Sequence, residues 1–277
     1  MKSGSLTLVP SGGLANRMYS IVSAYNLCQK AGVALSVIWF KDRFLSAGFS
    51  DIFRLMECDG IRLRDGDFLD YIVNDRPRRK NLYVPYLFQK LKYDGAIYEN
   101  EVSGLKESGM DFKEWVRGRH CYMSNYQEFG DYDKGMLIKM FRPVDEVMSV
   151  VNRNVESFSN NTIGIHIRRS DHIIAIRESP TYLFINKAKE EITRNDSTKF
   201  YLATDDLGIK EEFKSIFGDR MITMAGNVDR SSVRGIRGGL VDMWTLSMTK
   251  RIYGSANSTF SMAAAAVGNT GLIILRK

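Results

Sequence analysis

The chain has 277 residues, of which 44% are hydrophobic and 26% charged, and 39 basic against 32 acidic residues give a formal net charge of +7. This composition is typical of a folded globular protein and excludes collagen-like, low-complexity and disordered chains. The length predicts two modest domains or one large α/β domain. The positive charge fits an anionic ligand or an anionic membrane surface, and charge alone does not choose between them.

Further classes are excluded by what the sequence lacks. No apolar run approaches the roughly 18 residues that span a bilayer, and no continuous apolar signal segment opens the chain. We therefore expect a cytoplasmic protein. Its three cysteines, Cys28, Cys58 and Cys121, form no CxxC pair, so neither a disulfide framework nor a structural zinc site is expected.

The first elements predicted along the chain form a β-α-β unit. A strand over 6–9 precedes a tight turn and a long amphipathic helix over 14–30, which Gly32 ends, and a buried strand covers 33–40. Such a unit joins parallel strands by a right-handed crossover.

The segment 41–108 is less regular. It holds a basic run over 76–80 and an aromatic-rich stretch over 83–88. The basic run could touch an acidic acceptor, lipid headgroups or nucleic acid, and a solvated loop is the interpretation that we favour. No nucleic-acid-binding motif occurs elsewhere in the chain.

The second half of the chain alternates strands and helices. After a strand over 119–123 and a helix over 143–157, the polar link at 159–161 predicts a boundary between domains 1–158 and 159–277. Strands are then predicted over 162–168, 199–204, 220–224, 251–255 and 272–275, and helices over 180–193, 207–217, 239–249 and 259–267. This alternation is typical of a doubly wound α/β domain. Two such Rossmann-like domains facing a cleft would bind ligands at the carboxyl ends of both sheets.

The strongest motif is His-Ile-Arg-Arg-Ser-Asp over 166–171. In a strand with a two-residue period the alternating isoleucines share one face, so the strand delivers His166 and then Arg168 and Arg169 to its carboxyl end. Paired arginines suit a pyrophosphate, because each guanidinium makes forked, charge-assisted bonds that contribute about 1.5–3 kcal/mol each. The alternative is that both arginines pair with surface carboxylates.

A second strand end carries two carboxylates, Asp205 and Asp206. They stand where a loop enters a helix. Asp206 is also well placed to cap that helix.

A third strand end runs into a helix of small residues that begins with Ser258, Thr259 and Phe260. Backbone N–H groups at a helix start, with hydroxyls beside them, make an anion site, although Ser258 could simply cap the helix. Nearby, Asp242 stands in a largely apolar helix. Its carboxylate could accept both edge donors of a guanine or pair with Arg237.

The first turn holds Gly12 and Gly13, which let the backbone approach a ligand closely, followed by Asn16 and Arg17. This turn is neither a Walker loop nor a GxGxxG fingerprint, so the sequence gives little support to a P-loop NTPase or an NAD-dependent enzyme. The chain has no HExxH, EF-hand loop or GxSxG elbow, so neither a metal site nor a serine hydrolase is expected.

Taken in order, the motifs at 12–17, 166–171, 201–206 and 257–261 resemble those of the fucosyltransferase superfamily. That group holds the α1,2- and α1,6-fucosyltransferases, the rhizobial nodulation fucosyltransferases and the protein O-fucosyltransferases, and the bacterial α1,2 enzymes are the nearest subgroup. The motif His-x-Arg-Arg-x-Asp is the most specific element. The resemblance implies a two-domain GT-B architecture, with GDP-fucose bound mainly by the C-terminal domain and fucose transferred with inversion, without a metal, to a glycan or other hydroxyl acceptor.

The resemblance also implies roles for the residues of the arginine motif. Arg168 matches the arginine that binds the donor β-phosphate. Arg169 and Asp171 complete that motif, and His166 supports the nucleotide. Asp205 lies near the nucleoside or braces the arginines.

Further roles follow for the other motifs. Asp206 completes the acidic pair on the donor side, Asp242 matches an aspartate that recognises guanine, and residues 258–260 match the phosphate-binding helix start. The turn at 12–13 lies on the donor side, and Asn16 matches an asparagine that faces the reaction centre. A base is needed near the acceptor hydroxyl, and Glu178 and Asp171 are the two candidates.

The chain also departs from the family pattern. The glycine-rich turn of the α1,2 group reads Gly-Gly-Leu-Gly-Asn-Gln, whereas Ala15 and Arg17 stand here, and Ser170 replaces the glycine that commonly follows the arginine pair. The acceptor and the linkage are therefore open. A GT-B enzyme for another nucleotide sugar and a non-catalytic sugar-binding homologue are the alternatives. A bacterial enzyme with peripheral contact at the inner membrane is the expected setting.

Overall fold

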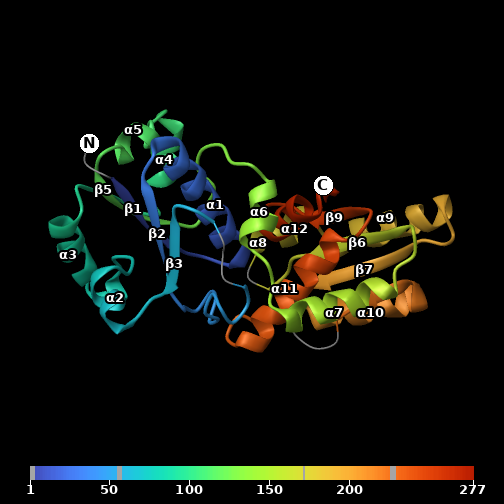
Figure 1. Ribbon diagram of the computed structural model, residues 1–277. Helices are drawn as coiled ribbons and strands as arrows, with labels where there is room; N and C mark the ends of the chain where they lie inside the picture. Colours follow the sequence, from blue (N-terminus) through green and yellow to red (C-terminus); the bar gives the residue numbers. More distant parts are fainter. Residues whose placement is uncertain (1–3, 55–57, 171, 225–228) are drawn as a thin grey trace. The chain divides into compact units, whose positions relative to one another are not determined.

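The computed structural model describes residues 4–54, 58–170, 172–224 and 229–277. The chain forms two compact units, Met1–Arg142 and Pro143–Lys277. Each unit contains a five-stranded sheet in which the paired strands are parallel, with helices packed against it (Figure 1). The predicted α/β architecture with two Rossmann-like sheets is therefore confirmed.

The first sheet has the strand order β3-β2-β1-β5-β4, so that β1 is central. Its strands are β1 (Ser5–Pro10), β2 (Ala34–Trp39), β3 (Ile61–Asp65), β4 (Gly95–Ile97) and β5 (His120–Asn125). The chain leaves β1 toward β2 on one side and returns to pair β5 on the other. The carboxyl end of β1 is thus the switch point, where open parallel sheets bind ligands.

The helices of the first unit differ greatly in length. They are α1 (Leu14–Ala31), α2 (Phe68–Val73), η1 (Arg79–Asn81), α3 (Val84–Lys92), α4 (Val102–Glu107), α5 (Phe112–Val116) and α6 (Gly135–Met140). As predicted, α1 ends at Gly32, whose φ of 66° lies in the left-handed region that glycine tolerates.

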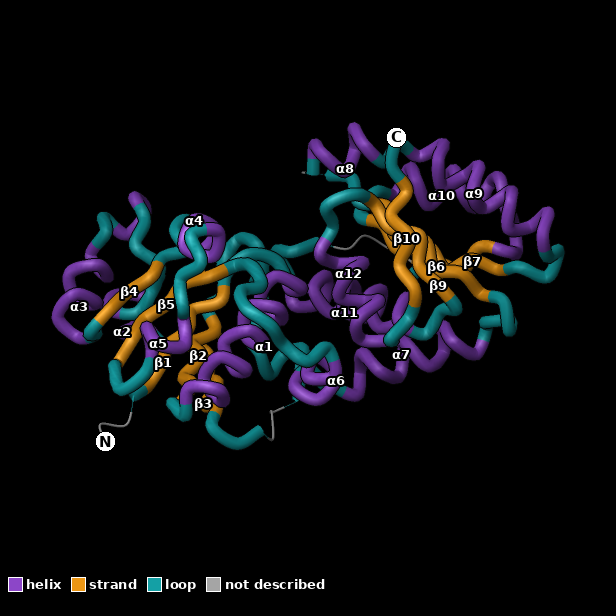
Figure 2. The backbone as a smooth tube through the Cα atoms, turned by 90° about the horizontal axis from the view of Figure 1, so that it is seen from above, coloured by secondary structure: helices purple, strands orange, loops and turns teal. Residues whose placement is uncertain are grey.

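The second sheet has the strand order β10-β9-β6-β7-β8, with β6 central. Its strands are β6 (Thr162–Ile167), β7 (Lys199–Thr204), β8 (Met221–Thr223), β9 (Arg251–Ser255) and β10 (Gly271–Leu275). The helices are α7 (Asp145–Glu156), α8 (Ile173–Glu178), α9 (Thr181–Arg194), α10 (Leu207–Phe217), η2 (Gly218–Arg220), α11 (Val233–Ser247) and α12 (Thr259–Gly268). Figure 2 shows the same elements from above.

Both faces of β6 are buried, which fixes the register of the arginine motif that follows it. On one face Ile163, Ile165 and Ile167 belong to a core cluster with residues of α9 and α10, as their two-residue period predicted. On the other face, a Cβ on Gly164 would lie 2.7 Å from Thr249 Oγ1. Only glycine lets the end of α11 approach the strand so closely.

Two predicted boundaries were wrong. The division between the units falls after Arg142 rather than at 158–159, because α7 packs on α11, where Asn154 Nδ2 donates to Thr245 Oγ1 at 3.3 Å. Helix α11 also begins at Val233 rather than at 239. Ser232 caps this earlier start by accepting the N–H of Gly235.

The segment 41–108, where no elements were assigned from sequence, contains β3, α2, η1, α3, β4 and α4. These elements are three to nine residues long, which is too short for a clear period. Within the described residues, none of the helices has the length and apolar character needed to cross a bilayer.

The side chain of Arg17 is fully buried and links the glycine-rich turn to the segment that follows β2. Its Nε donates to the oxygen of Gly12 at 3.0 Å and its Nη1 to the oxygen of Phe40 at 2.6 Å, while Nη2 lies 3.1 Å from Asp42 Oδ1. Burial lowers the pKa of Arg17 to about 10. Arg17, which stands where the α1,2 group has glutamine, therefore holds the turn in place through these contacts.

Replacing Arg17 should destabilise the protein. Arg17→Gln removes two hydrogen bonds and leaves a partly buried carboxylate short of a partner, so the free energy of unfolding should fall by about 3 kcal/mol. Urea unfolding measures this change. The control is Arg43→Gln, an exposed arginine of the neighbouring loop, for which a change within about 0.5 kcal/mol is expected. Equal midpoints for the two variants would contradict the structural role.

Candidate active site

Three neighbouring strands of the second sheet end in polar groups. Arg168 follows β6, Asp205 follows β7, and Ser255 is the last residue of β9. Because β7 and β9 flank β6 in a parallel sheet, these residues meet at the carboxyl edge. The chain runs from β6 to β7 on one side and later reaches β9 on the other, so this edge is the switch point of the second sheet.

Arg168 is held from both flanking strands. Its backbone N–H donates to Ser255 Oγ at 3.0 Å, and its guanidinium forms an ion pair with Asp205 Oδ2. Both charged side chains are largely buried. The strand ends therefore fix the position of a permanent positive charge.

The Asp205 carboxylate contacts three successive residues. Besides the ion pair with Arg168, its Oδ1 accepts the N–H of Arg169 at 2.8 Å and its Oδ2 accepts Ser170 Oγ at 2.7 Å. Ser170 has a φ of 39°, in the left-handed region that favours glycine. Its hydroxyl bond to Asp205 offsets part of that strain. Of the two roles open to Asp205, the structure shows the contacts that brace the arginines.

Arg169 is buried, and its donors are directed into the unit. Nη1 donates to the oxygen of Arg168 at 2.9 Å, and Nη2 donates to the oxygen of Ser179 at 3.1 Å and to Thr181 Oγ1 at 2.9 Å. Burial lowers its pKa. The structure thus places Arg169 as a clamp between the strand end and α9. Its contact with a phosphate stays a prediction.

His166 stacks on Phe260, which brings two predicted site residues together. Their ring centroids are 4.8 Å apart and their planes differ by 27°. The imidazole is 6% exposed, and burial lowers its pKa to about 3, so the ring is neutral near pH 7. Its Nδ1 is buried and has no hydrogen-bond partner among the described residues. Such an atom costs about 1–3 kcal/mol, which a ligand could recover.

Helix α12 begins shortly after β9, the strand that pairs with β6 on the side opposite β7. Ser258 is the N-cap residue and is buried, but its hydroxyl makes no capping bond. The first N–H groups of a helix and its dipole favour an anion. Thr259 follows at the first helical position and is exposed.

The other two acidic residues predicted on the donor side, Asp206 and Asp242, each accept a hydrogen bond within the second unit. Asp206 caps α10 by accepting the N–H of Ile209 at 3.2 Å, which is the capping role that its position suggested. Asp242 Oδ1 accepts the hydroxyl of Tyr201 at 2.6 Å, and burial raises the pKa of Asp242 to about 6. Recognition of guanine by Asp242 stays a prediction.

The two candidate bases differ in what the structure shows. Glu178 is the last residue of α8, and its Oε1 accepts a bond from Arg177 Nη2 at 3.2 Å. Asp171 lies outside the described residues.

In the first unit, Gly12, Gly13 and Asn16 lie together after β1. Gly12 has a φ of 78°, and a Cβ there would lie 3.0 Å from Asn16 Nδ2. Beside them, Ser11 Oγ donates to Glu99 Oε2 at 2.6 Å. The turn is therefore linked to Glu99, a charged residue that the sequence analysis did not identify.

The sequence analysis assigned no role to Ser179 or to Tyr201. Ser179 Oγ accepts the N–H of Ala256 at 2.8 Å and donates to the oxygen of Leu275 at 2.5 Å, which ties the loop before α12 to β10. Only the folded chain brings these segments together, so a lone serine gave no signal. For Tyr201, a phenol inside a buried strand was the available signal, because such hydroxyls require a partner.

Comparison with known proteins shows what the fold resembles. No protein-family model and no curated protein matches the chain. Among solved structures, fucosyltransferase NodZ from Bradyrhizobium matches with a TM-score of 0.68 and 15% identity over 95% of this chain and 92% of that one. A variant of Arabidopsis thaliana FUT1 in complex with GDP matches with a TM-score of 0.63 and 16% identity over 99% and 70%. POFUT1 in complex with GDP matches with a TM-score of 0.60 and 10% identity over 99% of each chain.

These likenesses cover nearly the whole of this chain, and they establish a shared fold. NodZ alpha-1,6-fucosyltransferase has also been crystallised after soaking with GDP-fucose, at a TM-score of 0.66 and 15% identity over 96% of this chain and 93% of that one. The predicted GT-B-like fold class is confirmed: this chain has the fold of the fucosyltransferases that its motifs resemble.

Asp242→Asn should flatten the pH dependence of stability. Burial raises the pKa of Asp242 from an ordinary 3.8 to about 6, so between these values the folded protein keeps a proton that the unfolded chain has lost. The free energy of unfolding of the wild type should therefore fall as the pH rises through this window, by up to about 3 kcal/mol. Urea unfolding across the window should show a smaller slope in the variant. The exposed Asp219→Asn serves as control, and a wild-type slope in Asp242→Asn would contradict the assignment.

Proposed function

We propose that the protein is a fucosyltransferase that transfers L-fucose from GDP-fucose to a hydroxyl of a glycan or another acceptor. The observation that carries this proposal is the guanidinium of Arg168, held by Asp205 and Ser255 at the switch point of the second sheet. It is supported by the shared fold with proteins crystallised with GDP-fucose or GDP.

The donor pyrophosphate binds at the carboxyl edge of the second sheet. Arg168 binds the β-phosphate with forked hydrogen bonds, and the first N–H groups of α12, after Ser258, bind its other oxygens. The unsatisfied Nδ1 of His166 takes a donor from the nucleotide or from a water beside it. Asp205 keeps Arg168 aimed at the phosphate, because the carboxylate also holds the backbone of the next residue.

The chemistry follows from these charges. The bond between C1 of fucose and the β-phosphate oxygen breaks, and its electron pair leaves with GDP. The acceptor oxygen bonds to C1 from the opposite side and loses its proton to a carboxylate, either Glu178 or Asp171. Negative charge grows on the β-phosphate in the transition state, so Arg168 and the helix start stabilise that state more than the bound donor.

Arg168→Ala should abolish transfer without unfolding the protein. A preorganised donor of this kind contributes about 10²–10³ in kcat. GDP-fucose turnover, measured by release of GDP, should fall by at least that factor, while the thermal unfolding curve should show a folded protein. The matched control is Arg194→Ala, which removes an exposed arginine of α9 and should leave turnover unchanged. Substantial turnover by Arg168→Ala would overturn the site.

The two candidate bases can be separated by their pH profiles. A residue that takes the proton must be ionised, so its loss should remove the fall in kcat at acidic pH as well as lower kcat. We expect one of Glu178→Gln and Asp171→Asn to show this change and the other to keep the wild-type profile. If both variants keep the wild-type profile, neither carboxylate is the base.

The nucleotide preference tests the donor. Calorimetric titration should show binding of GDP and none of UDP at the same concentration. Asp242→Asn should weaken GDP binding, because an amide cannot accept both edge donors of guanine. Equal binding of GDP and UDP would instead favour a glycosyltransferase for another nucleotide sugar.

A further inference from the structure

Helix α3 presents its apolar residues to solvent. Of its nine residues only Pro85 and Gln89 are buried, whereas Leu87 is 64% and Leu91 88% exposed. The buried amide of Gln89 donates from Nε2 to the oxygen of Asp75 at 2.9 Å. A surface helix ordinarily buries its apolar stripe and exposes its polar one. In α3 the large apolar residues are exposed together with Lys90 and Lys92, and only Pro85 and Gln89 form the buried side.

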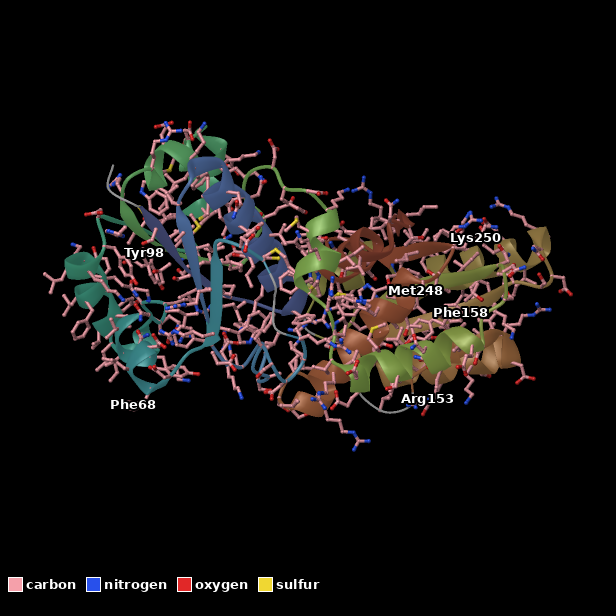
Figure 3. All side chains as sticks on the ribbon, viewed as in Figure 1. Phe68, Tyr98, Arg153, Phe158, Met248 and Lys250 are labelled. Atoms are coloured by element: carbon pink, nitrogen blue, oxygen red, sulfur yellow. The ribbon has the colours of Figure 1, made fainter. Side chains whose placement is uncertain are left out.

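Helix α2 and the link between the helices also expose apolar side chains. Within α2 only Asp70 is buried, and Phe68 is 83% exposed. The two helices pack together and lie side by side in both views (Figures 1 and 2), and Figure 3 shows the side chain of Phe68 at the margin of the first unit. We call this surface the α2–α3 face and define it by Phe68, Leu69, Leu82, Tyr83, Leu87 and Leu91, all of them exposed.

Positive charge is interleaved with these apolar residues. The stretch 76–92 contains six basic residues and no acidic one. Two of the six pair with carboxylates, and the other four, Arg79, Lys80, Lys90 and Lys92, are exposed. Of the basic run over 76–80, Arg79 and Lys80 are exposed beside these apolar residues, whereas Arg76 and Arg78 pair with carboxylates.

A cavity next to this surface carries more positive charge. It has a volume of about 220 Å³, and its lining includes Arg62, Arg64 and Lys92. Arg64 pairs with Asp70, while Arg62 lies on β3 and is exposed. The cavity is large enough for a phosphate group. Basic side chains that can bind phosphate therefore lie next to the exposed apolar residues of the α2–α3 face.

We propose that the α2–α3 face docks on a membrane surface that carries anionic lipids. Its apolar side chains enter the boundary between headgroups and acyl chains, and the exposed cations bind lipid phosphates. Nucleic acid would satisfy the cations but leave Leu87 and Leu91 in water. A second copy of this chain would bring two sets of these exposed cations together, which like charges oppose.

Docking in this way orients the first unit. Arg76 begins the basic stretch and pairs with Glu99 at 3.1 Å, and Glu99 accepts the hydroxyl of Ser11 in the turn after β1. The membrane-bound face would therefore hold the carboxyl edge of the first sheet near the lipid headgroups.

Vesicle sedimentation tests the proposal without using enzymatic activity, so its outcome is independent of the proposed fucosyl transfer. The full chain is mixed with vesicles of phosphatidylcholine alone or of phosphatidylcholine with phosphatidylglycerol. The wild type should sediment with the anionic vesicles and stay in solution with the neutral ones. Leu87→Glu/Leu91→Glu should bind at least about tenfold more weakly. Arg79→Gln/Lys80→Gln/Lys90→Gln should lose about fivefold per charge removed.

The matched control is Ile138→Glu/Ile216→Glu, which adds the same charge at exposed helical positions of α6 and α10 and should keep wild-type binding. All the variants replace exposed side chains, so their thermal unfolding should match the wild type. The proposal is overturned if the wild type stays in solution with anionic vesicles or if the Leu87 and Leu91 variant binds like the control. Loss of binding only in the charge variant would indicate a general polyanion site. A wild-type dimer that Leu87→Glu/Leu91→Glu converts to a monomer would indicate a self-association surface.

Discussion

The carboxylate of Asp205 is the constraint on which the donor side of this protein depends. It pairs with Arg168, accepts the N–H of Arg169 and accepts the hydroxyl of Ser170, so one charged group fixes three successive residues. Because Asp205 and Arg168 follow neighbouring strands, the sheet itself sets their separation. An ion pair of this kind, largely removed from water, holds its geometry before a ligand arrives, which is the condition for electrostatic preorganisation.

The regular elements could be predicted because their signals are local. The alternating isoleucines of β6, the cap at Asp206 and the glycine that ends α1 each act within a few residues, and the structure confirms them. Partners brought together by tertiary folding gave no such signal. The bond of Tyr201 to Asp242 joins residues 41 positions apart, and the clamp by Arg169 depends on where α9 begins. The sequence therefore predicted which polar residues stand at the strand ends, but not the partners that the fold brings to them.

The short helices of the first unit escaped prediction for a related reason. In α3 the buried positions are held by Pro85 and by Gln89, whose amide bonds to backbone, so the pattern of apolar residues does not mark the core side. A rule that places apolar residues in the core fails at α3, because its large apolar residues are exposed. In the docking that we propose, four exposed basic residues lie near these apolar side chains, and this combination suits an anionic lipid surface.

A crystal structure with GDP-fucose is the sharpest test of the donor site. We expect the β-phosphate in contact with the guanidinium of Arg168 and with the first N–H groups of α12, and a polar group of the nucleotide or an ordered water on Nδ1 of His166. Binding of the nucleotide away from the carboxyl ends of β6 and β9, with the ion pair of Arg168 and Asp205 untouched by phosphate, would contradict it.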